Sequence, residues 1–245
     1  NNLDRGIHNS CNTYFSNVYR RIIDKDNNAP DGMNTWHSHL GSFGLGNYLG
    51  YDHPVGQSGY VPNANFYNLW YPNQRWRGAT TVSNAIGQGE ILMTPIQLAN
   101  VAATIANRGF FYSPHFVKGI QGDFIDSRYK TKRYTTISTK HFDPVVEGMA
   151  NVVKKGTARV AAVRGIEVCG KTGTIENFTK INGVSTQLTD HSMFIAFAPK
   201  ENPKIALAVI VENGYWGGRW AAPIASLVIE KYLSGDVKRK KKKKR

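Results

Sequence analysis

Residues 191–211 read HSMFIAFAPKENPKIALAVIV, and this stretch decides the fold of the chain. It holds two short apolar-rich segments, 191–198 and 204–211, on either side of the polar segment 199–203. Short apolar runs bounded by polar residues, proline or glycine are typical of β-strands. The segment between them reads as a hairpin loop, so we expect two antiparallel neighbouring strands.

Further secondary structure is expected on both sides of this hairpin. Residues 166–174 predict another strand, and the amphipathic segment 221–233 predicts a closing helix that packs onto the sheet. Upstream, Thr94 followed by Pro95 is typical of a helix start, which predicts a helix over 94–107. A second upstream helix is expected over 144–155.

The N-terminal part of the chain is less regular. The first 24 residues predict two helices separated by a polar break at 9–12, because apolar residues recur at helical spacing on both sides of it. Residues 27–83 are rich in Gly, Pro, Asn and Tyr and show little periodicity, so they predict only loops and short helices.

Helices first, an antiparallel sheet afterwards and a helix that covers the sheet define an α+β fold in one domain. We assign residues 1–235 to this domain. Its first part, 1–165, is expected to be mainly helix and loop, and 166–235 to hold the strands and the closing helix.

Charge is concentrated at the C-terminus. The formal net charge is +14, and the run KRKKKKKR at 238–245 supplies eight of these charges, which leaves +6 for the rest. We expect 236–245 to be a disordered basic tail that lies near anionic lipid or polymer. Basic and aromatic residues do not alternate elsewhere in the chain, so nucleic-acid binding has no support. No apolar run reaches the 18 residues needed to cross a bilayer.

Two cysteines, Cys11 and Cys169, are too few for a disulfide framework. Asp4, His8 and Cys11 lie close together in sequence, but a metal site would need a fourth ligand that nothing here supplies. We therefore predict no metal site, and interpret these residues as a plain helix face.

Two short motifs suggest chemistry. Lys171-Thr172-Gly173-Thr174 lies in the predicted strand 166–174, where the glycine leaves room for a ligand backbone and the flanking hydroxyls and lysine suit a carboxylate. Ser10-Cys11-Asn12 has the form S-x-N at the break between two helices, which equally describes a helix cap. An S-x-N loop followed much later by a K-T-G strand is the order of penicillin-recognising serine enzymes.

The resemblance extends over nearly the whole chain. It is carried by these segments: 86–100 (IGQGEILMTPIQLAN), 106–109 (ANRG), 114–115 (PH), 156–158 (GTA), 169–174 (CGKTGT), 190–191 (DH) and 197–199 (FAP). In this order they resemble the transpeptidase domain of class B penicillin-binding proteins. The elongation-type enzymes are most similar, and the division-type transpeptidases are the nearest competitor. The implied fold is that of penicillin-binding proteins and serine β-lactamases, a helical region beside an antiparallel sheet.

This resemblance implies a D,D-transpeptidase that cross-links peptidoglycan, shapes the cell wall and is inhibited by β-lactams. By similarity, Ser10 and Lys171 form a hydrogen-bonded pair that relays a proton to the leaving group, and Asn12 orients the substrate amide and the lysine. Thr172, Gly173 and Thr174 bind the substrate, with the threonine hydroxyls on its carboxylate. No cofactor is implied.

The implied partners are stem peptides that end in D-Ala-D-Ala, β-lactams and a membrane glycosyltransferase of the elongation machinery. The implied location is the periplasmic face of the bacterial inner membrane, with an anchor upstream of this chain. The competing hypothesis is a binding module of the same fold that senses β-lactams or stem peptides without turnover.

One departure from the family pattern concerns the nucleophile. The family order is S-x-x-K, then S-x-N, then K-T-G, and no serine precedes Ser10 in this sequence. We expect the nucleophilic serine to lie upstream of residue 1, so that the chain alone is inactive, its fold is incomplete at the N-terminus and a sheet edge is exposed. The one S-x-x-K match, Ser127-Arg-Tyr-Lys130, follows S-x-N in a polar stretch, and we interpret it as a chance match.

Three other features are open to two interpretations. His191 at a strand start is either a general base or, as we favour, a hydrogen-bonding residue, because no carboxylate partner is evident. Cys169 shares a strand face with Lys171 and is expected to be a buried, inert thiol. Trp216 and Trp220 belong either to a loop near the cleft or to the core.

Overall fold

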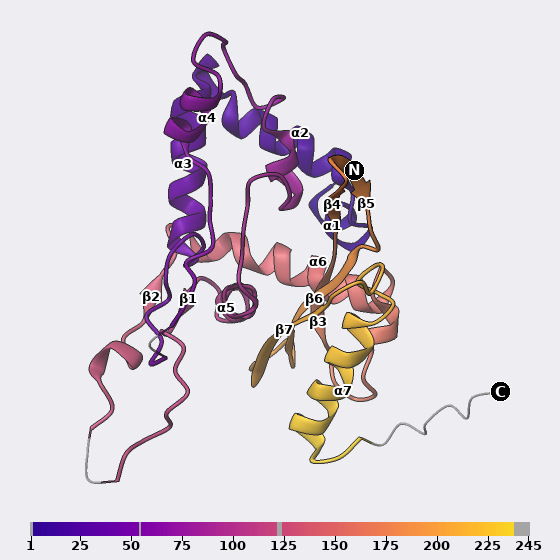
Figure 1. The fold of residues 1–245 in the computed structure, drawn as a ribbon. Helices are drawn as coiled ribbons and strands as arrows, with labels where there is room; N and C mark the ends of the chain where they lie inside the picture. The colour runs from indigo at the N-terminus through magenta and orange to yellow at the C-terminus, as the bar shows by residue number, and fades with distance from the viewer. Residues whose placement is uncertain (1, 54, 122–123, 238–245) are drawn as a thin grey trace, which may run out of the picture.

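The computed structural model describes residues 2–53, 55–121 and 124–237, and Figure 1 shows their arrangement. The basic run 238–245, predicted to be disordered, lies outside the described residues. Within the described part, no helix is both long and apolar enough to cross a membrane.

The elements in chain order are α1 (Leu3–His8), α2 (Asn12–Ile23), η1 (Lys25–Asn27), α3 (Ala29–Ser42), α4 (Ala64–Trp70), η2 (Val82–Ile86), α5 (Pro95–Ala106), β1 (Phe110–Phe111), η3 (Ser127–Tyr129), β2 (Arg133–Tyr134), η4 (Thr139–His141), α6 (Phe142–Lys154), η5 (Arg159–Ala161), β3 (Cys169–Ile175), β4 (Phe178–Ile181), β5 (Val184–Gln187), β6 (His191–Ala198), β7 (Ile205–Val211) and α7 (Ala221–Ser234).

The central sheet has three strands in the order β3-β6-β7. Both neighbouring pairs are antiparallel, so the predicted hairpin over 191–211 is confirmed. In the register of β3 against β6, Lys171 lies opposite Ile195 and Thr174 lies opposite Ser192. Strand β3 forms one edge of the sheet, which leaves its outer side open to other groups.

Helices cover the sheet in layers. Helix α7 packs on β6 and β7, α5 contacts the same two strands, and α6 contacts β3 and crosses behind the sheet in the view of Figure 1. Helix α1 packs on α6. The predicted α+β architecture is confirmed, and the helices expected near residues 94–107, 144–155 and 221–233 are α5, α6 and α7.

Local sequence explains where α5 begins. The Thr94 side chain accepts a hydrogen bond from the Gln97 backbone, and the Gln97 side chain accepts one from the Thr94 backbone, which together form a capping box. The buried Gln97 amide nitrogen also lies 2.8 Å from Ser58 O and 3.0 Å from Asn47 O. This single side chain therefore starts the helix and holds the preceding loop against it.

Helix α3 differs from the sequence prediction. It spans 14 residues in a stretch for which we expected only loops and short helices. The Asn28 side chain caps it, and Pro30 lies in its first turn. A Cβ added to Gly32 would collide with the Ile23 carbonyl of α2, so glycine is required for the close contact between these helices. Glycine and asparagine residues such as Gly32 and Asn28 also interrupt the apolar periodicity from which a helix is predicted, so the sequence did not indicate α3.

A second hairpin was also missed. Strands β4 and β5 pair antiparallel between β3 and β6 and form a separate two-stranded sheet. Phe178, Ile181 and Val184 are exposed on it, so burial does not impose a strand pattern on its sequence.

Two hydrophobic clusters divide the molecule. The first, which we call the sheet core, holds these buried residues: Ile7, Ala106, Val146, Met149, Ala150, Val152, Val153, Ala158, Ala161, Val163, Val168, Cys169, Phe194, Ala196, Phe197, Ala198, Ala221, Ala222, Ala225 and Ile229. The second, the aromatic core, holds Tyr19, Ile23, Ala29, Met33, Ala64, Tyr67 and Trp76. The aromatic core lies among α2, α3 and α4, away from the sheet (Figure 1).

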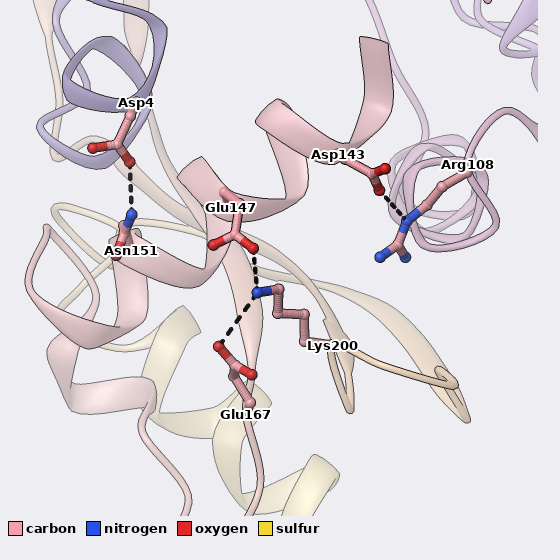
Figure 2. A network of polar contacts seen from close by, with 7 residues as sticks. All are labelled: Asp4, Arg108, Asp143, Glu147, Asn151, Glu167 and Lys200. Carbon is pink, nitrogen blue, oxygen red and sulfur yellow. Dashed lines mark hydrogen bonds and ion pairs between the residues drawn. The ribbon is translucent and has the colours of Figure 1, made fainter. Parts of the chain in front are cut away.

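Polar contacts brace the outside of the sheet core, as Figure 2 shows. The Lys200 ammonium, beyond the end of β6, forms ion pairs with Glu147 of α6 and, at 3.8 Å, with Glu167 before β3. Arg108 pairs with Asp143 at 3.1 Å, which ties the end of α5 to the start of α6. These contacts hold α5 and α6 against the sheet from the solvent side.

Candidate active site

Ser10 occupies a strained backbone position between α1 and α2. Its N–H donates to the Ile7 carbonyl at 3.1 Å and the next N–H, of Cys11, donates to the Gly6 carbonyl at 2.9 Å, which is the Schellman pattern at the end of α1. Ser10 takes the left-handed position of this motif, with φ of 53°, where glycine is the usual residue. A serine in this left-handed conformation is strained, which lowers the stability of the folded chain. Such strain is common at functional sites.

Lys171 reaches Ser10 from the far end of the sequence. Its ammonium donates to Ser10 Oγ at 2.8 Å, although the two residues are 161 positions apart. It also donates to the Thr172 carbonyl at 2.8 Å. Burial lowers the pKa of Lys171 to about 8, because the charged form is poorly solvated there. The ammonium therefore holds a proton at neutral pH but can release it more readily than an exposed lysine.

The backbone of β3 presents polar groups at its outer edge. Lys171 binds the Thr172 carbonyl and the Gln88 side chain lies 3.4 Å from the Thr174 carbonyl, so neither carbonyl is directed at β6. In an antiparallel pair, the N–H and C=O of one residue point to the same side, and alternate residues point outward. The Thr172 and Thr174 N–H groups consequently also face the outer edge, beside the Lys171–Ser10 pair.

The side chains and loops around this edge are closely packed. The Thr172 hydroxyl lies 2.8 Å from the Thr157 hydroxyl, which belongs to the loop after α6. The end of the Met193 side chain occupies the space where a side chain at Gly173 would lie, so a larger residue at that position would force Met193 to move. Thr174 is exposed.

Asn12 is the first residue of α2, two positions after Ser10, and its side chain is exposed. Within the described residues its side chain forms no hydrogen bond that ties it to Lys171. The structure therefore brings together Ser10, Lys171 and the Thr172–Thr174 edge, while Asn12 lies at the same loop and, among the described residues, forms no side-chain hydrogen bond with them. Sequence reasoning had not assigned Gln88 or Thr157 to the site, although both lie in segments that carried the family resemblance.

The other candidates from the sequence lie outside this arrangement. His191 Nδ1 accepts a hydrogen bond from the Asn213 N–H at 3.0 Å, which is the hydrogen-bonding role that we favoured. The predicted burial of Cys169 is confirmed, and burial raises the pKa of its thiol to about 12, which disfavours the reactive thiolate. Ser127 and Lys130 are exposed on the loop around η3, which Figure 1 shows far from β3.

The acidic and histidine residues of α1 have structural contacts. Asp4 accepts a hydrogen bond from the Asn151 amide at 2.7 Å, drawn in Figure 2, and lies 3.3 Å from His8 Nδ1. In the described part of the chain, no group of three or more His, Cys, Asp or Glu residues is arranged to hold a metal ion.

Comparisons with known proteins agree with the geometry. The model of the family described as penicillin binding protein transpeptidase domain matches residues 1–230. The chain therefore belongs to this family. A PBP2 from Pseudomonas aeruginosa has a similar structure, with a TM-score of 0.77 and 29% identity over 97% of this chain and 49% of the other.

Within the family, the chain is of the class B type represented by penicillin-binding protein 2, or MrdA. Peptidoglycan D,D-transpeptidase MrdA from Acinetobacter baumannii is 32% identical over 95% of this chain and 34% of its own length. MrdA from Escherichia coli is 27% identical over 96% of this chain and 37% of its own length. The chain thus spans about a third of the length of these curated relatives.

Proposed function

We propose that this chain supplies the S-x-N and K-T-G parts of the active site of a peptidoglycan D,D-transpeptidase. The observation that carries the proposal is the 2.8 Å contact between Lys171 and Ser10, two motif residues that lie at the open edge of β3. Residues 1–235 form the C-terminal part of the transpeptidase domain, and 236–245 form a basic tail outside it.

The proposed reaction begins at a serine upstream of residue 1. In this proposal the serine gives its proton to the lysine that the family places one helical turn after it, and its oxygen attacks the carbonyl of the penultimate D-alanine. The peptide bond to the terminal D-alanine breaks: Lys171 passes a proton to Ser10 Oγ while the Ser10 hydroxyl proton goes to the departing amine, so D-alanine leaves as a neutral amine. An amine of a second stem peptide then attacks the acyl-enzyme and forms the cross-link; its proton returns through Ser10 to Lys171, and the serine leaves with the proton held by the upstream lysine. The pKa of Lys171, about 8, suits a group that gives and regains a proton near neutral pH.

The edge of β3 holds the substrate in this proposal. The outward Thr174 N–H is one oxyanion donor, and removal of such a donor typically raises the barrier by about 2.7–4 kcal/mol. The hydroxyls of Thr172 and Thr174 bind the terminal carboxylate, and the substrate backbone lies along the outer edge of the strand at Gly173. Asn12, from the loop that holds Ser10, contacts the substrate amide once substrate fills the cleft.

The whole protein would act at the periplasmic face of the inner membrane, anchored by an upstream segment, together with a membrane glycosyltransferase. Two similar structures support partners of this kind. PBP2 from Helicobacter pylori, 27% identical with a TM-score of 0.73, was solved in complex with MreC. A chain in a peptidoglycan synthase complex that coordinates polymerization and crosslinking is 26% identical, with a TM-score of 0.78.

The test is the intact mass of the full-length protein after incubation with benzylpenicillin. We expect one covalent adduct per molecule, on a serine upstream of residue 1, and none on residues 1–245 alone. Ser10→Ala and Lys171→Ala should each slow adduct formation by about 100-fold or more, because proton transfer contributes roughly 10²–10⁴-fold to such reactions. Ser127→Ala serves as the control and should react like the wild type.

Other outcomes would change the proposal. An adduct on residues 1–245 would overturn the upstream nucleophile, and peptide mapping would identify the serine. An adduct on the full-length protein without cross-linking of stem peptides would indicate the sensing function instead. Failure of the full-length protein to react would refute both.

A further inference from the structure

The loop between β7 and α7 exposes an aromatic and cationic surface beside the candidate site. Tyr215, Trp216 and Trp220 are 47%, 58% and 49% exposed, so they do not serve as core residues. Arg219 lies among them and is exposed as well. Large aromatic side chains left in water next to a cation are more typical of a binding surface than of a packing surface.

The loop is fixed to the K-T-G strand. A Cβ added to Gly217 would lie 2.6 Å from the Gly173 carbonyl oxygen, so the loop backbone directly touches β3. The Ser192 hydroxyl donates to the Trp216 carbonyl at 2.9 Å and accepts from the Ala221 N–H at 3.1 Å. These contacts tie the middle of the loop and its junction with α7 to β6, the neighbour of β3. The surface therefore has a set position next to the candidate site.

Arg219 is held in place by the aromatic rings. Its guanidinium lies 4.2 Å from the centre of the Tyr215 ring and 5.5 Å from that of Trp216. Its backbone N–H donates to the Trp216 carbonyl at 2.9 Å. In the part of the chain that the structure describes, no carboxylate lies within ion-pair distance of Arg219. Stacking restrains the guanidinium plane, while its N–H edge stays free for a planar anion.

We propose that Arg219, braced by Tyr215 and Trp216, binds a carboxylate of the stem peptide at the end of the cleft next to Gly173. A guanidinium recognises carboxylates through two parallel hydrogen bonds, and prior stacking reduces the side-chain freedom lost on binding. The proposal rests on the transpeptidase function above and adds a specificity residue to it. The carboxylate is either the terminal one or one within the stem.

The experiment compares peptide donors in the full-length protein. Four soluble donors ending in D-Ala-D-Ala are used: one with all carboxylates free, one amidated only at the C-terminus, one amidated only within the stem, and one amidated at both places. We expect Arg219→Gln to raise KM for the fully acidic donor about tenfold while kcat changes little, because one charge-assisted contact is lost. Arg219→Lys should recover only part of the loss, since it keeps the charge without the planar fork.

Matched variants separate the proposal from general effects. Arg164→Gln, which removes an exposed arginine outside the loop, should leave KM unchanged. Tyr215→Leu with Arg219 retained should raise KM by a smaller factor than Arg219→Gln, because the guanidinium is no longer held in place.

The donors identify the carboxylate. If wild type and Arg219→Gln have equal KM values on one of the singly amidated donors, Arg219 binds the carboxylate that this donor lacks. An Arg219 effect that persists on both singly amidated donors and vanishes on the doubly amidated one shows that either carboxylate is bound. Equal KM values on every donor, or an equal loss on the doubly amidated donor, overturn the proposal. If the wild type forms no acyl-enzyme with benzylpenicillin, the transpeptidase function itself fails, which is a distinct result.

Discussion

The sheet core and the aromatic core are built in different ways. The sheet core consists mainly of alanine, valine and isoleucine, with Phe194 and Phe197 as its large members. The aromatic core is closed by a polar network: Tyr67 donates to Glu90 at 2.6 Å, and the buried Asn84 amide donates to Tyr67 Oη at 2.7 Å. The sheet core therefore depends mainly on close packing, with ion pairs at its surface, and the aromatic core depends on both packing and internal hydrogen bonds.

Ser10 lies where these two regions meet. Ile7 of α1 belongs to the sheet core, and Tyr19 of α2 belongs to the aromatic core. Each core thus fixes one of the two helices that flank the Ser10 loop. A mutation that loosens the packing of the sheet core should therefore displace Ser10 relative to Lys171. So should a mutation that removes a hydrogen bond from the aromatic core.

The largest effect is expected in the sheet core. Phe194 is fully buried, and its ring occupies the space beside Gly170 in the neighbouring strand. Phe194→Ala should lower the free energy of unfolding by about 3–5 kcal/mol, because it removes a buried ring and leaves a cavity. Urea unfolding of the chain measures this loss. Phe178→Ala, at a ring that is 55% exposed, is the control and should change stability by less than about 0.5 kcal/mol. Similar losses for the two variants would contradict the burial of Phe194.

A smaller effect is expected in the aromatic core. Tyr67→Phe keeps the ring but removes the hydroxyl that contacts both Glu90 and Asn84. Both groups lose this partner, although the Asn84 amide keeps its 3.3 Å contact with Tyr19 Oη, so the free energy of unfolding should fall by roughly 1–3 kcal/mol. Tyr232→Phe, at an exposed tyrosine of α7, is the matched control and should be neutral. A neutral Tyr67→Phe would show that these hydrogen bonds do not stabilise the aromatic core.

Lys171 should make stability depend on pH. Its pKa is about 8 in the folded chain and 10.5 for an ordinary lysine, so the unfolded chain holds more protons between these values. Stability of the wild type therefore rises with pH from about 8 to 10.5. Lys171→Met lacks this titration and should be more stable than the wild type by about 1 kcal/mol at pH 7, since the two lysine hydrogen bonds offset part of the burial penalty.

Unfolding curves of the wild type and Lys171→Met at pH 7, 8, 9 and 10 test this. The advantage of the variant should be constant below pH 8 and shrink as the pH rises. Parallel curves for the two proteins across this window would mean that the pKa of Lys171 is not lowered.

The smallest effect concerns the Ser10 loop itself. Ser10→Gly should be more stable than Ser10→Ala by about 1 kcal/mol, because only glycine adopts the left-handed backbone without strain. Both variants lose the contact with Lys171, so their difference isolates the backbone. Asn9 has a right-handed backbone, and Asn9→Gly should gain nothing relative to Asn9→Ala. Thermal unfolding compares the two pairs, and an equal difference at both positions would contradict strain at Ser10.

Sequence reasoning succeeded where the signal is local. Thr94 and Pro95 predicted the start of α5, and the apolar run before Pro199 predicted the bounds of β6. It failed for α3, whose Gly32 is required by contact with α2, and for the β4–β5 hairpin, whose exposed strands carry no burial pattern. For α3, the sequence does not reveal that α2 packs against it. For the hairpin, it does not reveal that the strands form without being buried by other elements.

The candidate site divides in the same way. The motifs named Ser10, Asn12 and Lys171-Thr172-Gly173-Thr174 from the sequence, but did not indicate that Gln88 and Thr157 would adjoin them. Both contacts join residues that are distant in the chain, so no local spacing predicts them.

The sequence by itself determined helices α1, α2, α5, α6 and α7, the antiparallel pair β6–β7 and the family, because caps, apolar runs and motif order are properties of neighbouring residues. Only the tertiary structure decided that burial lowers the pKa of Lys171, that the Thr172 and Thr174 amides face outward, and that Arg219 stacks on Tyr215 and Trp216. The physical reason is that a lysine pKa, the direction of a backbone amide and the room around a glycine depend on what packs against them. Those neighbours are supplied by strand register and by the two cores.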